Sequence, residues 1–136
     1  MDKRILMGGL AALGTMLGVD LLAQLSGWRL DLPVRTGLGI VPVGSIVTTL
    51  VAMAVGGWIA RHRFRWTAVA LNAAVWIATI GVLMALAPST GAAATITLPG
   101  IAKLNALALV LSLGASWLGA VLGERLAARR RLPASA

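Results

Sequence analysis

The sequence contains no cysteine and only one histidine, and these two shortages limit its chemistry. Without cysteine the chain has no disulfide, no thiolate nucleophile and no Cys-ligated metal, and its redox compartment stays undecided. With His62 alone, we expect no histidine-based metal site or proton relay within one chain. The few acidic residues form no carboxylate pair, and neither a phosphate-binding loop nor a pair of haem ligands is present. We therefore expect no catalysis by this chain, no metal and no cofactor.

Long apolar runs fill most of the chain instead. Of its residues 59% are hydrophobic and 12% are charged, and the charges lie almost wholly between four apolar runs. Each run has about the ~20 residues that a helix needs to cross a bilayer. The sequence predicts an all-α membrane protein, a four-transmembrane-helix bundle that forms one integral membrane domain over 1–136. The expected spans are 5–25, 41–60, 66–87 and 104–122, with outer hairpins at 26–40 and 88–103 and a basic tail at 123–136.

The distribution of Lys and Arg predicts the orientation. Three of these residues, Arg29, Arg35 and Lys103, lie in one set of loops, and the other nine of the 12 lie at the ends of the chain or between the second and third spans. Because cytoplasmic loops retain Lys and Arg, both termini are expected in the cytoplasm. The first run follows Lys3 and Arg4 as a signal peptide would, but it is too long and lacks an Ala-x-Ala cleavage pattern, so we expect a retained helix.

The net charge of +8 is better explained by lipids than by nucleic acid. The basic residues cluster at membrane boundaries, and no basic soluble domain is present, so we expect no nucleic-acid binding. Anionic head groups on the cytoplasmic side are the expected contacts of Arg61, Arg63, Arg65, Arg129, Arg130 and Arg131.

Small and polar residues recur at helical spacing along three of the spans. In lipid, such residues mark where helix backbones approach each other, with hydroxyl and amide groups as hydrogen-bond partners. A polar stripe can also line an aqueous path, but none of these stripes contains an ionised residue, which favours packing. The predicted packing residues outside the first span are Ser45, Thr49, Gly56, Asn72, Asn105, Ser112, Ser116, Gly119 and Gly123.

The first span has two marked faces. Gly14 and Gly18 form a GxxxG pair, whereas Asp20 and Gln24 project to approximately the opposite side. One neighbouring helix cannot cover both faces. We therefore expect this helix to be central in the bundle or shared with another subunit.

Asp20 is the sharpest candidate for function. It lies about 22 Å along the helix from Ile5, in the outer leaflet, where an unpaired carboxylate costs roughly 2.5 kcal/mol or more. It has two interpretations: a structural ion pair with Lys103, Arg29 or Arg35, which we favour because these cations lie at matching depth, or a site with Gln24 for a proton or a cationic substrate.

The loop between the first two spans is rich in Pro and Gly, which oppose a regular helix. Its Trp28 and Arg29 suit a segment at head-group level, and a re-entrant loop over 26–44 is the alternative.

Two membrane-protein families share features with this chain. Its size, its four spans and the acid in the first helix are similar to the small multidrug resistance transporters, which carry a glutamate in that helix; here the acid is Asp20, it lies further outward, and the aromatic surroundings of that site are missing. The Gly, Thr and Asp content of the first helix resembles the lipid-linked-sugar flippases, but their Asn-Phe signatures are absent. Neither resemblance assigns a family.

We expect a non-catalytic membrane subunit or accessory protein, in the style of the bacterial inner membrane, that packs against other membrane proteins or itself. The alternatives are a small homo-oligomeric transporter of protons or cationic substrates that uses Asp20, and a protein similar to the lipid-linked-sugar flippases.

Overall fold

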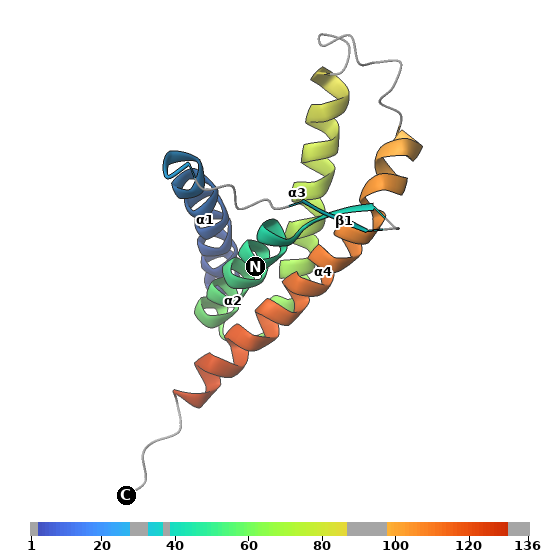
Figure 1. Ribbon diagram of the computed structural model, residues 1–136. Helices are drawn as coiled ribbons and strands as arrows, with labels where there is room; N and C mark the ends of the chain where they lie inside the picture. The colour runs from blue at the N-terminus through green and yellow to red at the C-terminus, as the bar shows by residue number, and fades with distance from the viewer. Residues whose placement is uncertain (1–2, 28–32, 37–38, 87–97, 131–136) are drawn as a thin grey trace, which may run out of the picture.

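The protein consists of four long helices and one short β-hairpin (Figure 1). A computed structural model describes residues 3–27, 33–36, 39–86 and 98–130. The helices are α1 (Lys3–Leu25), α2 (Val43–Ala60), α3 (Phe64–Leu86) and α4 (Leu98–Arg129). All four are long and apolar enough to cross a membrane, which confirms the prediction of four helices of this kind.

The helix ends differ from the predicted ones mainly in α4. This helix begins at Leu98 and continues to Arg129, so it takes in part of the predicted second hairpin and part of the predicted tail. Pro99 lies in the first turn, where a helix tolerates proline because the missing N–H has no helical acceptor, and the Glu, Arg, Leu and Ala residues of 124–129 are good helix formers that extend α4 beyond its apolar part. In Figure 1, α4 therefore runs obliquely across the whole molecule.

The helices alternate in direction, so the described ends of α1 and α4 that lead to the two termini lie together. Gly8 near the start of α1 contacts Ala60 at the end of α2, and Glu124 near the end of α4 contacts Phe64 at the start of α3. We call this the basic end, because Lys3, Arg4, Arg61, Arg63, Arg65, Arg125, Arg129 and Arg130 gather there. The opposite end is called the hairpin end. Which end faces the cytoplasm stays a prediction.

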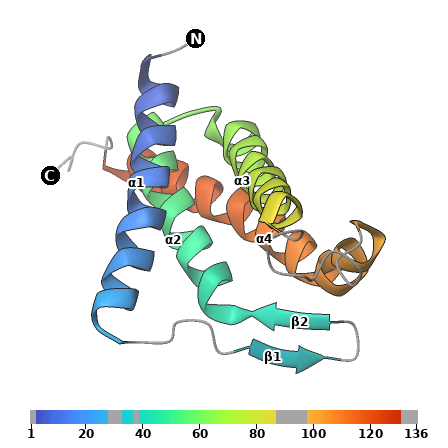
Figure 2. The ribbon, with the colours of Figure 1, turned by 90° about the horizontal axis from the view of Figure 1, so that it is seen from above.

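A two-stranded antiparallel sheet precedes α2, and it is the one departure from the predicted all-α class among the described residues. β1 (Pro33–Thr36) pairs with β2 (Gly39–Pro42), with Val34 opposite Val41. β-branched residues favour strands, and the terminal prolines of the two strands face each other at the open end of the hairpin. β2 packs against α4, where Val41 is buried, as the view in Figure 2 lets the reader follow.

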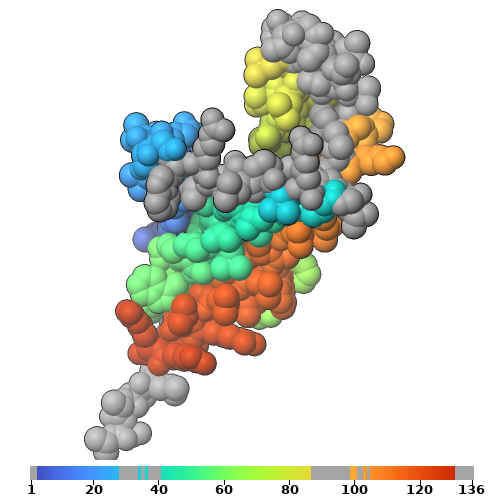
Figure 3. All heavy atoms as spheres, in the orientation of Figure 1, coloured from blue at the N-terminus to red at the C-terminus, as the bar shows by residue number. Residues whose placement is uncertain are grey.

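The tightest packing is between α2 and α4. A Cβ atom added to Gly57 would lie 2.5 Å from the carbonyl oxygen of Ala120, and Gly119 and Gly123 lie against the backbone of Leu50 and Ala54. Figure 3 shows the surfaces of green α2 and orange-to-red α4 adjoining along one face of the molecule. Backbones this close need residues without side chains, which is what small residues supply in helix pairs within lipid.

The apolar core is concentrated at the basic end. Phe64, the only phenylalanine, is fully buried and packs its ring against Gly56, and the core around it comprises Ala12, Met53, Ala60, Ala68 and Ala120. No described residue of α1 beyond Ala12, and none of α3 beyond Asn72, is buried. Towards the hairpin end, α1 and α3 diverge in both Figure 1 and Figure 2.

Candidate functional site

A cavity of about 230 Å³ lies between the four helices, on the hairpin side of the apolar core. Every helix contributes to its wall, and the polar members of the wall come from the predicted stripes of the second, third and fourth spans. The wall is formed by Met16, Pro42, Ser45, Ile46, Thr49, Asn72, Val75, Trp76, Thr79, Ala108 and Ser112.

Ser112 is the centre of a hydrogen-bond network in this wall. Its Oγ accepts a bond of 3.2 Å from Asn72 Nδ2 and one of 2.8 Å from Trp76 Nε1, and it donates to the carbonyl oxygen of Leu109 at 3.0 Å. Asn72 and Trp76 lie one turn apart on α3, so both reach the same hydroxyl on α4. The network joins α3 to α4, as hydroxyl and amide groups do between helices in membranes.

The cavity is polar but carries no charge. No Asp, Glu, Lys or Arg is among its wall residues, and its hydroxyl, amide and indole groups are neutral. Ser45 and Thr79 are exposed members of the wall, so the cavity reaches the surface beside these two residues. The opening lies about 22 Å along α2 and α3 from the basic end, as judged from the helical rise over 15 residues.

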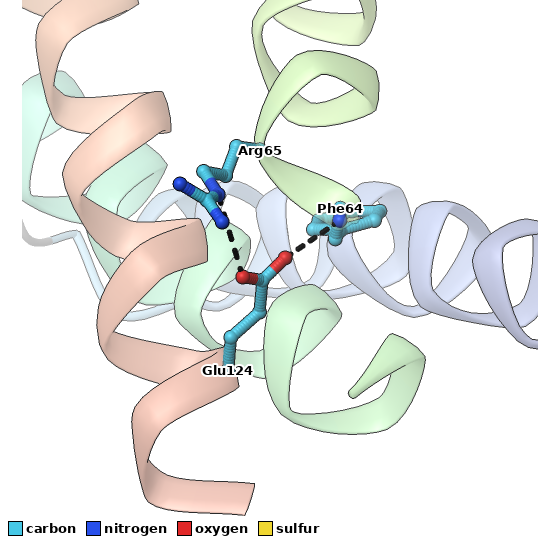
Figure 4. Close-up of polar contacts among 3 residues, drawn as sticks. All are labelled: Phe64, Arg65 and Glu124. Atoms are coloured by element: carbon cyan, nitrogen blue, oxygen red, sulfur yellow. Dashed lines mark hydrogen bonds and ion pairs between the residues drawn. The ribbon is translucent and has the colours of Figure 1, made fainter. Parts of the chain in front are cut away.

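A second polar junction closes the basic end (Figure 4). Glu124 Oε1 accepts a hydrogen bond of 2.6 Å from the backbone N–H of Phe64, the first residue of α3, and Glu124 Oε2 lies 3.6 Å from Arg65 Nε. The side chain of Glu124 is 14% exposed and that of Arg65 is 50% exposed. A carboxylate at this position satisfies one of the free N–H groups of the helix start and complements its dipole. Glu124 thus holds α4 to the α2–α3 turn.

Sequence reasoning missed Glu124, although a signal for it was present. It is the only acid after Asp31, and it directly follows Gly123 in a stretch that otherwise carries basic charge. An isolated acid next to a close-packing glycine indicates a specific partner rather than a solvated face.

The structure does not bring Asp20 to Lys103. Asp20 and Gln24 are exposed on α1, and the side chain of neither forms a hydrogen bond or an ion pair with a described residue. The side chains of Arg29 and Arg35, the other proposed partners, lie outside the described residues. Asp20 is one turn beyond Met16 on the same face of α1, and Met16 belongs to the cavity wall.

The glycines predicted to pack fall into two groups. Gly56, Gly119 and Gly123 lie against neighbouring helices, and each has a heavy atom closer than an added Cβ would tolerate. Gly14 and Gly18 have nothing within 4 Å of an added Cβ. Of the other predicted packing residues, Thr49, Asn72, Ser112 and Ser116 are buried, Asn105 is half-buried and Ser45 is exposed.

The arginines at the basic end are exposed. Arg61, Arg63, Arg65, Arg129 and Arg130 all reach the surface, and Arg131 lies outside the described residues. The guanidinium of Arg130 lies 5.2 Å from the centre of the Trp58 ring, which is a cation–π geometry. These positions suit the predicted contacts with lipid head groups, which stay a prediction.

Comparison with known proteins gives no indication of function, so the function is inferred from the residues described above. No family model, curated protein or solved structure matches the chain. Within the described part of the chain, no group of three or more His, Cys, Asp or Glu residues is placed to hold a metal ion.

Proposed function

We propose that this protein is a non-catalytic membrane subunit that packs the uncovered side of α1 against another membrane helix, either from a different protein or from a second copy of the chain. The observation that carries the proposal is the contrast between the Gly14–Gly18 pair of α1 and the Gly119–Gly123 pair of α4. Gly119 and Gly123 each receive a neighbouring backbone, whereas Gly14 and Gly18, with the same spacing, receive none from the described residues.

An uncovered glycine pair is unfavourable unless something packs there. Glycine inside a helix costs roughly 0.5–1 kcal/mol of helix stability relative to alanine. Two glycines one turn apart therefore weaken α1, and no close contact within the described part of the chain offsets this cost. A backbone that approaches this face from another helix gains close contact, as α2 does at Gly119.

The exposed polar groups of α1 support the same proposal. Asp20 and Gln24 lie in a helix that is apolar enough to span a membrane, and among the described residues they have no partner. A carboxylate that faces hydrocarbon alone costs about 2.5 kcal/mol or more. A donor or cation on a partner helix would remove that cost, and because Asp20 projects away from Gly14 and Gly18, this would be a second helix of the assembly.

The test replaces Gly18 by leucine. Purification from native membranes is expected to recover the wild-type chain with a stoichiometric partner or as a dimer. Gly18→Leu should break this association because the larger side chain holds two backbones apart. The thermal transition of the isolated chain should persist, because nothing in the described structure lies within 4 Å of the added Cβ.

Gly114→Leu is the matched control. Gly114 is also a helix glycine with nothing within 4 Å of an added Cβ, but no second glycine lies four residues before or after it. The proposal fails if the wild-type chain is monomeric in its native membrane, or if Gly18→Leu and Gly114→Leu affect association equally.

Proximity can be measured in the membrane itself, since the chain has no cysteine of its own. A single cysteine at Leu21, which is 58% exposed on the uncovered side of α1, should cross-link to a partner. A cysteine at Val110, 63% exposed on α4, should not. Equal cross-linking at both positions would indicate random collision.

A second candidate function, transport of protons or cationic substrates by a homo-oligomer, rests on Asp20. The observation in its favour is that this carboxylate lies one turn from Met16 and therefore near the cavity wall. The substitution that separates the two functions is argued in the Discussion.

A further inference from the structure

One oxygen of a buried side chain in the cavity wall has no hydrogen-bond donor among the described residues. Asn72 is 2% exposed and uses Nδ2 to bond Ser112, but no donor among the described residues reaches its Oδ1. Every fully enclosed polar side-chain atom of the described residues has a partner, so this oxygen borders open space. Because Asn72 lines the cavity, that space is the cavity.

The remaining polar groups of the wall match a neutral ligand. Thr49 and Thr79 donate to carbonyl oxygens of their own helices, at 2.8 Å and 2.9 Å, so their oxygens remain free to accept a bond. Ser45 makes no side-chain hydrogen bond with a described residue, so its hydroxyl is free both to donate and to accept. A phosphate would find no cation in this wall, and an ammonium group would find no anion among its residues, because Asp20 lies one turn outside the wall on α1.

The opening of the cavity faces the apolar side of the bundle. Val82 and Leu83 on α3 are exposed one turn beyond Thr79 and on the same side of the helix, and large exposed apolar side chains on a helix that spans a membrane face lipid. A ligand that enters here comes from the bilayer. At about 22 Å from the basic end, the opening lies in the far leaflet of a hydrocarbon core about 30 Å thick, on the hydrocarbon side of the lipid head groups.

From these observations we infer that the cavity binds the uncharged, hydroxyl-bearing head group of a membrane lipid, which enters sideways between α1 and α3. The lipid hydroxyl donates to Oδ1 of Asn72, and Ser45 and Thr79 bond the head group at the opening. The volume of about 230 Å³ admits a group much larger than a single water molecule. The acyl chains stay in the bilayer, against the exposed sides of α1 and α3. This site does not depend on a partner for α1.

The probe is a diacylglycerol with a photoreactive acyl chain, added to liposomes that contain the full-length protein. Irradiation should attach it to α1 or α3 next to the opening, and mass spectrometry of the peptides locates the adduct. Unlabelled diacylglycerol should compete with the probe. Phosphatidic acid with the same chains should not compete, because it brings a charge, and triacylglycerol should not, because it has no free hydroxyl.

Isosteric variants test the hydrogen bonds without disturbing the helices. The double variant Ser45→Ala, Thr79→Val removes two hydroxyl groups at the opening, where both residues are exposed. Loss of even one hydrogen bond weakens binding about fivefold. The concentration of unlabelled diacylglycerol that halves the labelling should therefore rise at least about fivefold in the double variant. Thr15→Val is the matched control, because Thr15 also bonds its own helix but does not line the cavity. It should leave the competition unchanged.

Filling the cavity gives an independent measurement. Ala108 is 1% exposed and belongs to the wall, so Ala108→Leu places a larger side chain in the ligand space and should abolish the adduct. Should this variant fail to fold, the Ser45 and Thr79 variant still decides the matter. Equal competition by triacylglycerol, or an adduct that the double variant leaves unchanged, would mean ordinary lipid contact and would overturn the inference.

Discussion

Gly123 of α4 lies directly against the carbonyl oxygen of Ala54 in α2, so that even a methyl group at this position would overlap backbone atoms. The same helix pair is in contact again at Gly119 and Leu50, one turn earlier. Two close contacts one turn apart determine how α4 crosses α2. The position of α4 in turn determines where Ser112 meets α3 and where Glu124 meets the start of α3.

Gly123→Ala should therefore destabilise the protein strongly for so small a change. Overpacking a well-packed contact costs typically 1–3 kcal/mol, and here the obstructing atoms are backbone atoms that move only with the helix. Unfolding of the purified protein in detergent, followed by helix content, measures the loss. Gly114→Ala should be neutral or stabilising, because nothing lies within 4 Å of its added Cβ. Equal stability of the two variants would contradict the packing of α4 on α2.

Glu124→Ala should lower stability by about 1–2 kcal/mol, because it leaves the N–H of buried Phe64 without an acceptor. Glu124→Gln keeps an oxygen for that N–H and should be much milder. Arg65→Gln should cost less than about 1 kcal/mol, since a half-exposed ion pair is screened by water. The same unfolding measurement compares all three variants. Equal losses for Glu124→Gln and Glu124→Ala would assign the effect to the ion pair instead of the backbone bond.

The four helices were predictable from the sequence because each depends on a local property, a run of about 20 apolar residues. The residues of the cavity wall were also visible singly: Ser45, Asn72 and Ser112 stand in stripes at helical spacing. Their convergence was not predictable, because it depends on how the helices cross and rotate. Periodicity gives the direction of a side chain around its own helix and says nothing of the helix it meets.

Two features escaped prediction for different reasons. The strands β1 and β2 have four residues each and lie among prolines and glycines. Their β-branched residues are too few in a row to form a recognisable strand pattern. Glu124 lies past the apolar part of its span, in a stretch that reads as a basic tail, whereas α4 continues through it to Arg129. Its role became visible only when the helix was seen to pass the start of α3.

The orientation of the bundle is expected to follow its basic end. Nine of the 12 Lys and Arg residues lie in the chain ends and the 61–65 turn, and such residues stay in the cytoplasm. A reporter fused after residue 136 should be active on the cytoplasmic side, and one inserted near Thr90 should be active on the other side. The paired reporters serve as controls for each other, since an enzyme active only outside and a fluorophore active only inside must give opposite results. A C-terminus on the outside would contradict the predicted orientation, and it would place Asp20 and the cavity opening in the inner leaflet instead of the outer one.

Asp20→Asn distinguishes the two proposed functions of α1. If Asp20 pairs with a group on a partner helix, asparagine retains a hydrogen bond, so folding and association should survive with a modest loss of stability. If Asp20 carries a proton or a cation, the neutral side chain should leave assembly intact and abolish flux, because the exchangeable charge does the transport. We expect the first outcome, since Gly14 and Gly18 on the same helix independently call for a partner. The measurement combines purification from native membranes with flux of a cationic dye in liposomes, and Val110→Ala, at an exposed position on α4 outside both proposed sites, serves as the control. Flux by the wild-type protein that disappears in Asp20→Asn while assembly persists would establish transport instead.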